Sequence, residues 1–413
     1  MTADRHPGVD DPGGRPPDGL RVRLDATALL GRPTGVGVFC QGVLGGLAAR
    51  GDVAVGAFAV SWRRRRRLEG VLPAGVDAAQ RAMPARPLHA LWRRADAPPV
   101  EWFVGACDVV HGTNFVVPPT RSAVPVVTVH DLTTLRFPEM CDAATLAYPA
   151  LIRRALRRGA WVHTPSSFVA AEVVEAFGVA PERVRAVYSG TPTRAAYPAT
   201  PPGVLHPGTP TADGGPAPAD PPTGVLPAGT DRYVLAVGTA EPRKDLPGLV
   251  AAFTDVADER PDVSLVLAGP EGWGSADLQA AVEASPARAR IVRTGWLDDR
   301  RLVSLLEGAA VLAYPSRYEG FGFPPLEAMA AGVPVVATRA GALPEVLGDA
   351  AELVPVGDRT ALAGALARVL DSDERRLALV ARGRDRAARY TWARCAQGLV
   401  DLYRDALADH RGR

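Results

Sequence analysis

Short apolar runs alternate with helix-like segments along most of this chain, and the alternation occurs twice. In the first half the runs cover residues 20–24, 53–60, 108–111 and 124–129, and a second series begins at residue 233. Runs this apolar are typical of parallel strands that are covered by helices on both faces. A chain of 413 residues also exceeds the size at which a single core stops growing. The sequence therefore predicts an α/β protein with two Rossmann-like, doubly wound domains.

Composition sets the expected domain boundaries. Two segments are rich in proline and glycine and poor in large apolar side chains, which is typical of a disordered tail and of a flexible linker or insertion. We expect a disordered N-terminus at 1–19, a first Rossmann-like domain at 20–191, the linker or insertion at 192–230, a second Rossmann-like domain at 231–390, and a helix at 391–413 that crosses back to the first domain.

The charges nearly balance, with 47 Lys and Arg against 45 Asp and Glu and a net charge of +2. A chain without a large positive excess is not expected to bind nucleic acid. The local exception is residues 63–67, five consecutive arginines. They predict either a solvated loop or a peripheral contact with an anionic membrane, and both interpretations remain open.

The four cysteines, Cys40, Cys107, Cys141 and Cys395, have neither a pairing pattern nor metal-ligand spacing. Reduced thiols in a cytoplasmic protein are the simplest interpretation, and no metal or other cofactor is expected. No run approaches eighteen apolar residues, and the first residues do not have the pattern of a signal peptide. The expected location is the cytoplasm, or the inner face of the cell membrane if the arginines contact lipid. The oligomeric state is not predicted.

The stretch EGFGFPPLEAMAAG at residues 319–332 places Glu319 and Glu327 eight residues apart. Pro324 or Pro325 suits the start of a short helix, which would place Glu327 in its first turn. Glycines before that helix allow a ligand to approach the backbone, and free amides at a helix start suit phosphate. Two carboxylates suit sugar hydroxyls, so a nucleotide-sugar is the first ligand to consider. The alternative is a capped helix with two solvated glutamates.

A second group of polar residues directly follows the strand predicted near residue 233. Gly238 is followed by Arg243 and Lys244, and two cations at the carboxyl end of a parallel strand suit a diphosphate. Further along, Trp296 and Leu297 follow another predicted strand and could flank a base. An exposed charged loop and an ordinary half-buried tryptophan are the alternatives.

The first domain offers its own candidates. Gly35 and Gly37 belong to a glycine-rich turn between a strand and a helix, either for close approach to a ligand or for turn geometry alone. This turn lacks the spacing of a dinucleotide-binding fingerprint. His111, His130 and Asp131 follow strands and are expected at the ligand-binding edge of the sheet. A structural histidine and a turn cap are the alternatives.

These segments together resemble the retaining GT-B glycosyltransferases, specifically glycosyltransferase family 4 (glycosyl transferases group 1), and their EPRKN-type mannosyltransferase-like subgroup. The segments are EGFGFPPLEAMAAGVPVVAT at 319–338, preceded by AYPSRYE, VGTAEPRKDL at 237–246, DVVHGTNFVVPP at 108–119, VTVHDLTTLRFPE at 127–139 and HTPSSF at 163–168. The resemblance implies two domains that face a cleft. This chain departs from many family members because it has Gly238-Thr239 where they have Gly-Arg. Arg243 is therefore the natural replacement for the missing phosphate-binding arginine.

The resemblance also implies roles for individual residues. Glu319 would contact the hydroxyls of the donor sugar, Glu327 the ribose, and Lys244 the diphosphate. His130 would lie beside the sugar and the reacting centre. The remaining donor-side residues expected are Gly320, Phe321, Gly322 and Phe323.

The activity implied is metal-independent transfer of a hexose from a nucleotide-sugar, with GDP-mannose as one candidate, to a glycan, lipid-linked or small-molecule acceptor. Neither glutamate is assigned as a nucleophile, because retention in this family is attributed to front-side attack assisted by the leaving phosphate. The Asp371-Ser372-Asp373 stretch has the form of a metal motif but is interpreted as a helix cap. The alternatives are a catalytically silent glycan-binding protein and a GT-B nucleotide-sugar epimerase or sugar phosphorylase.

Overall fold

A computed structural model of the chain describes residues 19–31, 34–62, 67–79, 81–143, 145–192, 227 and 231–412. The predicted disordered N-terminus, almost all of the predicted linker, and residues 63–66 of the arginine run lie outside these ranges. The described chain has an N-terminal half (residues 19–192) and a C-terminal half (residues 231–391), followed by the last helix. The exact domain boundaries remain a prediction.

The N-terminal half is built on a parallel sheet of seven strands in the order β3-β2-β1-β4-β5-β6-β7. The strands are β1 (Leu20–Asp25), β2 (Val53–Phe58), β3 (Asp77–Ala78), β4 (Val109–Gly112), β5 (Val124–Thr128), β6 (Trp161–Thr164) and β7 (Val184–Ala186). The helices are α1 (Gly35–Ala48), α2 (Ala85–Arg94), α3 (Glu101–Val104), α4 (Thr133–Arg136), α5 (Tyr148–Arg157) and α6 (Ser167–Phe177). Strands β4, β5 and β6 are buried along their whole length, as expected for a sheet covered on both faces.

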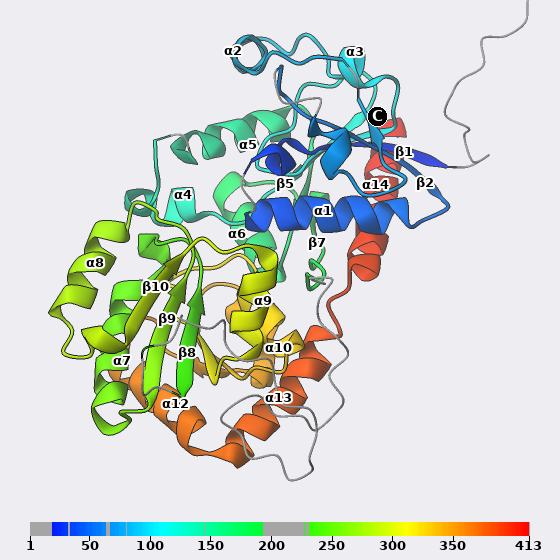
Figure 1. Cartoon of the computed structure of the whole chain (residues 1–413). Helices are drawn as coiled ribbons and strands as arrows, with labels where there is room; N and C mark the ends of the chain where they lie inside the picture. Colours follow the sequence, from blue (N-terminus) through cyan, green and yellow to red (C-terminus); the bar gives the residue numbers. More distant parts are fainter. Residues whose placement is uncertain are drawn as a thin grey trace, which may run out of the picture.

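The C-terminal half repeats the plan with a six-stranded parallel sheet in the order β10-β9-β8-β11-β12-β13. The strands are β8 (Arg232–Val237), β9 (Val263–Ala268), β10 (Ile291–Gly295), β11 (Val311–Tyr314), β12 (Val335–Thr338) and β13 (Glu352–Val354). The helices are α7 (Leu246–Glu259), α8 (Ser275–Ala284), α9 (Asp299–Glu307), α10 (Phe323–Ala330), α11 (Leu343–Leu347), α12 (Arg359–Asp371) and α13 (Asp373–Ala387). The predicted α/β class with two Rossmann-like, doubly wound units of GT-B type is confirmed (Figure 1).

In both sheets the chain order reverses at the middle, between β1 and β4 and between β8 and β11. Ligands of open parallel sheets bind at such switch points, beyond the carboxyl ends of the strands. The segments that follow β8 and β11 are therefore the ones that build the site in the C-terminal half.

The last helix, α14 (Trp392–Arg411), leaves the C-terminal half and packs against α1, as expected (Figure 1). Its buried face carries Leu399, Val400 and Tyr403, which join the core formed by β1, β2 and α1. A 20-residue helix with one apolar face gains most of its stability from such packing. The C-terminus thereby ties the two halves together.

Side-chain caps explain several helix starts. Ser166 accepts a hydrogen bond from the backbone N–H of Val169 at 3.3 Å and begins α6. Ser372 accepts one from Arg375 at 3.2 Å and begins α13, so the Asp371-Ser372-Asp373 stretch is a helix cap, as predicted.

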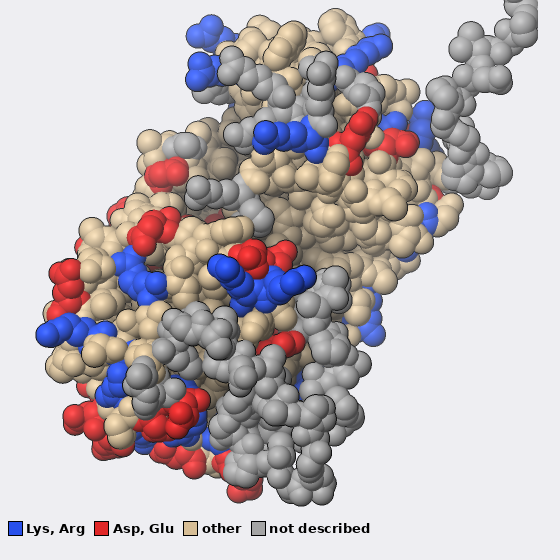
Figure 2. Space-filling view, in the orientation of Figure 1, with Lys and Arg blue, Asp and Glu red and all other residues tan. Residues whose placement is uncertain are grey.

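Charge is unevenly distributed on the face that Figure 2 shows. Charged side chains gather over the C-terminal half, whereas the surface around α1 is largely uncharged. The sequence of α1, GVGVFCQGVLGGLA, accounts for this because it contains no charged residue. Among the described helices, none is both long and apolar enough to span a bilayer.

Candidate active site

Two loops of the C-terminal half meet at the carboxyl edge of its sheet. β8 and β11 are paired neighbours, so the turn after β8, which carries Arg243 and Lys244, lies beside the loop after β11, which carries Glu319. The first turn is a short 3₁₀ segment, Pro242–Lys244. Parallel pairing alone therefore brings together residues that are 75 positions apart in the chain.

Glu319 lies between the two cations. Its Oε1 is 2.6 Å from Lys244 Nζ, and its Oε2 is 2.8 Å from an Arg243 guanidinium nitrogen. Lys244 also donates a hydrogen bond to the hydroxyl of Tyr314 at 2.6 Å, and its Nζ lies 4.6 Å from the centre of that ring. The Glu319 side chain is only 7% exposed, so these charges interact with little screening by water. The predicted cluster of Arg243, Lys244 and Glu319 is thus present in the folded chain.

The site keeps Glu319 ionised. Burial alone would raise the pKa of Glu319, but Arg243 and Lys244 hold this pKa at about 2. Burial lowers the pKa of Lys244 by more than Glu319 raises it. Burial also opposes the charge on Arg243, but Glu319 and Asp131 raise its pKa above the ordinary value. At neutral pH the carboxylate therefore balances part of the positive charge that a diphosphate would otherwise meet.

Lys244 is unusual in this chain because it is the only lysine among 47 basic residues. An ammonium is a compact point charge, whereas guanidinium is a wide planar fork. The Lys244 ammonium contacts both Glu319 and Tyr314, and a β-carbon at Gly238 would lie 3.4 Å from its Cε. The single lysine of the chain therefore lies in the candidate active site.

The loop after β5 in the N-terminal half meets the Glu319 loop. A β-carbon at Gly320 would lie 1.9 Å from the carbonyl oxygen of His130, so only glycine fits there. The hydroxyl of Tyr318 accepts a hydrogen bond from the backbone N–H of Leu132 at 3.0 Å and donates one to Glu172 of α6. The backbone on both sides of Glu319 is therefore held against the loop that carries His130.

His130 is partly buried beside this contact. Its Nε2 donates a hydrogen bond to the carbonyl of Thr113 at 2.8 Å, which assigns the remaining lone pair to Nδ1. Its ring packs edge-on against Phe39 and Phe115. Burial lowers the pKa of His130, so the ring is neutral near pH 7. A fixed, neutral imidazole can accept a hydrogen bond from a ligand at Nδ1.

Three predicted residues of the N-terminal half have local roles. Asp131 accepts a hydrogen bond from the backbone N–H of Thr133 at 2.9 Å and caps the turn that begins α4. Gly35 and Gly37 form the first turn of α1, where the Thr34 side chain accepts a hydrogen bond from Gly37 at 3.3 Å. A β-carbon at Gly35 would lie 3.7 Å from the Phe323 ring, so the start of α1 also lies against the C-terminal half.

His111 does not lie where an acceptor-side residue was expected. It is fully buried, and its ring nitrogens bind the hydroxyls of Tyr403 at 2.6 Å and Thr128 at 2.7 Å. Burial lowers its pKa well below the usual range, which keeps the ring neutral. The contacts fit the alternative of a structural histidine, because Nδ1 binds Tyr403 of α14 and Nε2 binds Thr128 of β5, which leaves neither nitrogen for a ligand.

The helix of the Glu319–Glu327 signature begins at Phe323, with Gly322 in the left-handed region at φ 106° before it. Glu327 consequently lies in the second turn of α10, not in the first turn as predicted, and is 4% exposed. Phe321 is buried and packs edge-on against Phe323. Both rings belong to the wall behind the Glu319 loop.

Trp296 and Leu297 follow β10 at the same edge of the sheet. Trp296 is 52% exposed and Leu297 packs on the core, so only the tryptophan ring offers a free face to a ligand. Among the described residues, no three His, Cys, Asp or Glu side chains are grouped in the manner of a metal site.

Sequence reasoning missed three residues of this region. Tyr314, at the end of β11, binds Lys244, and a signal for it existed because strand ends at a switch point are ligand-binding positions. Glu172 and Ser166 contact Tyr318 and the carbonyl of Gly320 across the two halves. No local pattern marks these two, because their partners are 146 and 154 positions away.

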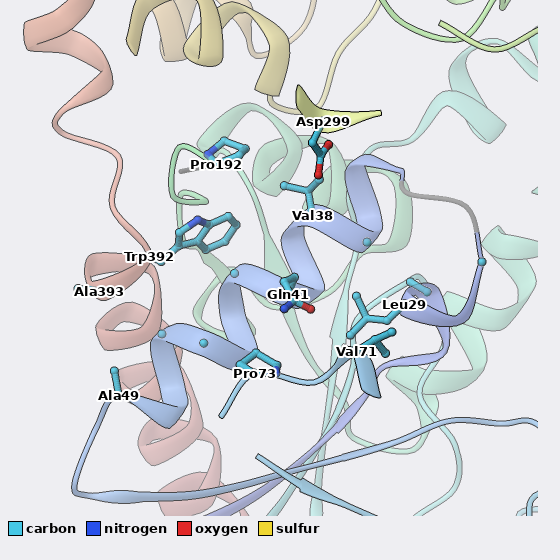
Figure 3. Close-up of a pocket in the computed structure, with 16 residues that line it drawn as sticks. Leu29, Val38, Gln41, Ala49, Val71, Pro73, Pro192, Asp299, Trp392 and Ala393 are labelled. Carbon is cyan, nitrogen blue, oxygen red and sulfur yellow. The ribbon is translucent and has the colours of Figure 1, made fainter. Parts of the chain in front are cut away.

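A groove of about 900 Å³ runs along α1 (Figure 3). Its lining is more apolar than polar and includes Leu29, Val38, Val71, Pro73 and Trp392, with Gln41 on α1 and Asp299 approaching from the C-terminal half. The Trp392 ring lies 6.3 Å from that of Phe323, at the start of the signature helix. The groove thus adjoins the wall of the candidate active site.

Two family models match the chain over most of its length. Residues 33–195 match the model described as Glycosyltransferase Family 4, and residues 224–386 match the one described as Glycosyl transferases group 1.

Curated relatives agree with these matches. The O-antigen chain mannosyltransferase B of Escherichia coli is 30% identical over 298 residues, which covers 72% of this chain and 74% of that protein. An MMP alpha-(1->4)-mannosyltransferase of Mycolicibacterium hassiacum is 45% identical over 116 residues, which covers 27% of this chain and 28% of that protein.

Solved structures share the fold. The sucrose-phosphate synthase of Thermosynechococcus elongatus superposes with a TM-score of 0.68 at 20% identity, covering 94% of this chain and all of that one. WaaG, a glycosyltransferase involved in lipopolysaccharide biosynthesis, superposes with a TM-score of 0.64 at 16% identity, covering 93% of this chain and 99% of that one. Together with the sequence matches, these findings show that the chain belongs to glycosyltransferase family 4, the glycosyl transferases group 1, and is a glycosyltransferase of GT-B fold.

Proposed function

We propose that the protein is a retaining, metal-independent hexosyltransferase of the EPRKN-type, mannosyltransferase-like subgroup. Its donor would be a nucleotide-sugar, with GDP-mannose the first to test, since the curated relatives named above are mannosyltransferases. The observation that carries the proposal is the position of Glu319, between Arg243 and Lys244 and directly beside the loop of His130.

The cations suit the departure of a nucleoside diphosphate. As the glycosidic bond breaks, negative charge grows on the phosphate, and preorganised cations in a buried site stabilise that charge without reorganisation. Arg243 and Lys244 are already held in place by Glu319, so the site needs little further ordering when the donor binds. In this proposal the two cations supply the stabilisation that a metal ion supplies in other enzymes.

Glu319 is better suited to holding the donor than to attacking it. Both of its oxygens are engaged by cations, and its low pKa makes it a weak nucleophile. Its remaining lone pairs can accept hydrogen bonds from sugar hydroxyls. Glu327 is proposed to contact the ribose, with Gly238, Gly320, Gly322, Trp296 and Leu297 around the nucleotide-sugar. His130 is proposed to contact the sugar through Nδ1, and retention then follows from attack on the same face that the phosphate leaves.

The acceptor is proposed to reach the site from the N-terminal half, along the groove on α1. The apolar side chains of this groove, with Asp299 at its edge toward the C-terminal half, favour an acceptor with an apolar part, so a lipid-linked acceptor is the first class to test before glycans and small molecules. Gly35, Gly37 and Asp131 lie on this side. A cytoplasmic location, with peripheral contact to the anionic inner face of the membrane, belongs to the same proposal. Sedimentation with anionic vesicles at low and high salt tests that contact.

A donor panel tests the reaction. Purified protein is incubated with GDP-, UDP- and ADP-hexoses and a prenyl-phosphate-linked or free sugar acceptor, with and without EDTA, and the anomeric configuration of the product is read by NMR. Glu319→Gln and Lys244→Ala should reduce turnover about 100-fold or more. Glu374→Gln, at an exposed position of α13, is the matched control and should not change it.

Three results would contradict the proposal. They are turnover that disappears with EDTA, a product of inverted configuration, and an unchanged rate in both site variants.

A further inference from the structure

A second pocket, of about 530 Å³, lies where the two halves join and shares no residue with the candidate active site. Four arginines line it: Arg185 of β7, Arg386 of α13, Arg389 just after α13, and Arg394 in the first turn of α14. Tyr188 and Glu345 also line the pocket. The pocket therefore gathers basic side chains from both halves of the chain.

The two carboxylates near this pocket, Glu345 and Asp405, already have hydrogen-bond or ion-pair partners. Glu345 accepts hydrogen bonds from the backbone N–H groups of Ser167 and Phe168 at 2.8 and 2.9 Å, and from the Tyr188 hydroxyl at 2.6 Å. Its carboxylate is thus occupied at the start of α6. Asp405 pairs with Arg185 at 2.5 Å.

The other three arginines keep their charge uncompensated. Arg386 donates a hydrogen bond to the carbonyl of Val346 at 2.7 Å, and Arg394 donates one to the carbonyl of Arg389 at 2.9 Å. Across the described ranges of the chain, no carboxylate forms an ion pair with Arg386, Arg389 or Arg394. Carbonyl oxygens orient a guanidinium but do not neutralise it. Three arginines without an ion pair against the one carboxylate of the lining, Glu345, leave the pocket with an excess of positive charge.

We propose that this pocket binds a phosphate-bearing ligand. Guanidinium groups bind phosphate oxygens in pairs, and several of them converging on a concave site favour a polyanion over a single carboxylate. The volume falls in the range of small-molecule sites. The phosphate can come from a soluble phosphorylated compound or from the headgroup of an anionic lipid, since the chemistry of recognition is the same.

A ligand in this pocket would affect how the two halves are arranged. Arg185 and Tyr188 belong to the N-terminal half, whereas Arg386 and Arg389 belong to the C-terminal half. A ligand that contacts both sets stabilises the arrangement in which they face one another. The bound anion would therefore favour the arrangement of the halves seen here, in which the Glu319 loop lies against His130.

The test compares anion binding by matched variants. Inorganic pyrophosphate is titrated calorimetrically, at constant ionic strength, into the wild-type protein, the double variant Arg389→Ala/Arg394→Ala and the single variant Arg382→Ala. Arg382 is an exposed arginine of α13 that lies outside the pocket, so it controls for the loss of surface charge. Both pocket positions are exposed as well, so the double variant is expected to fold.

Pyrophosphate will also bind Arg243 and Lys244, and that contribution is common to all variants. We expect the wild type and Arg382→Ala to show a further binding event that is at least tenfold weaker in the double variant. Arg389→Lys/Arg394→Lys, which keeps the charge but loses the paired geometry, should fall between them. Nucleotide-sugar binding should stay unchanged in every variant, which separates this inference from the proposed function.

A second arm identifies the source of the phosphate. Vesicles of phosphatidylcholine with and without phosphatidylglycerol are sedimented with the same proteins. If pyrophosphate binding weakens in the double variant, the ligand is a soluble phosphorylated compound. If only vesicle binding weakens in the double variant, the ligand is a lipid headgroup. The inference is overturned if neither arm distinguishes the double variant from Arg382→Ala.

Discussion

The carbonyl oxygen of His130 and the α-carbon of Gly320 are so close that a β-carbon at position 320 would lie 1.9 Å from that oxygen. This contact joins the loop after β5 to the loop after β11, and therefore sets the distance between His130 and Glu319. Gly320→Ala should push the two loops apart. A displacement of about 1 Å in a reaction centre lowers turnover by about 100-fold, and the added methyl group costs about 1–3 kcal/mol of stability.

Gly51→Ala is the matched control, because a β-carbon at Gly51 meets nothing within 4 Å. Turnover and thermal unfolding of the two variants are compared. Wild-type turnover in Gly320→Ala would show that the contact does not position the site.

Tyr318 supplies a second connection between the halves. Tyr318→Phe removes the acceptor for the Leu132 N–H and the donor to Glu172, leaving buried polar groups unsatisfied at a cost of about 1–3 kcal/mol. Glu172 also pairs with Arg136 at 2.9 Å, so it keeps this ion pair in the variant. We expect kcat to fall more than donor binding weakens. A double-mutant cycle with Glu172→Gln measures the coupling by denaturant unfolding and by kcat, and additive effects would refute a direct link.

Lys244 allows a test of geometry at constant charge. Lys244→Arg keeps the positive charge but places a wider group between Glu319 and Tyr314, so kcat/KM should fall by about 100-fold. The matched change Arg232→Lys alters an arginine outside the site and should leave kcat/KM unchanged.

Because the chain has no other lysine, an amine-reactive reagent reports on Lys244 and the terminal amine alone. Saturating donor should protect Lys244 and leave the terminal amine reactive, as measured by peptide mass spectrometry. Equal modification of Lys244 with and without donor would contradict a contact with the diphosphate.

The pKa of Glu319 predicts a pH dependence of stability. In the folded protein this pKa is about 2, against an ordinary value of 4.5, because Arg243 and Lys244 outweigh the effect of burial. The stabilisation is therefore complete above pH 4.5 and is lost as the pH falls toward 2, with a magnitude on the order of 3 kcal/mol. Glu319→Gln should flatten the unfolding free energy in this window, whereas Glu374→Gln should not. Parallel pH profiles for wild type and Glu319→Gln would contradict the low pKa.

The hydrogen bond between Tyr403 and His111 holds α14 on the first sheet. Tyr403→Phe leaves the buried Nδ1 of His111 without its donor, which should cost about 1–3 kcal/mol in chemical unfolding. Tyr188→Phe, at an exposed tyrosine, is the comparison and should cost less. Equal stability of Tyr403→Phe and wild type would show that the hydrogen bond is not needed to anchor α14.

Local sequence patterns predicted much of the fold. Apolar runs anticipated β1, β4, β5 and β8 because a strand buried on both faces must be apolar along its whole length. A strand end followed by polar residues anticipated Arg243 and Lys244 for a similar reason, since parallel strands place their carboxyl ends at one edge. The glycine-rich helix start at residues 319–332 anticipated Glu319. The resemblance to family 4 then assigned roles that spacing alone left open.

The predictions for His111 and for the first turn of α10 failed for identifiable reasons. His111 lies within strand β4, whereas His130 comes after β5, and nothing local to His111 indicates that α14, almost 300 residues later, will bury it under Tyr403. The start of α10 depends on the left-handed conformation of Gly322, which moved Glu327 into the second turn.

By itself, the sequence determined the class of fold, the two repeating units and the charged residues at the edge of the second sheet. These follow from periodicity and from chemistry that lies within a few residues. Only the tertiary structure decided that Gly320 lies against His130, that Tyr318 binds Glu172, and that four arginines surround one pocket. Each of these depends on how two separately folded sheets are oriented, and that orientation is set by packing between side chains far apart in the chain, which local patterns do not encode.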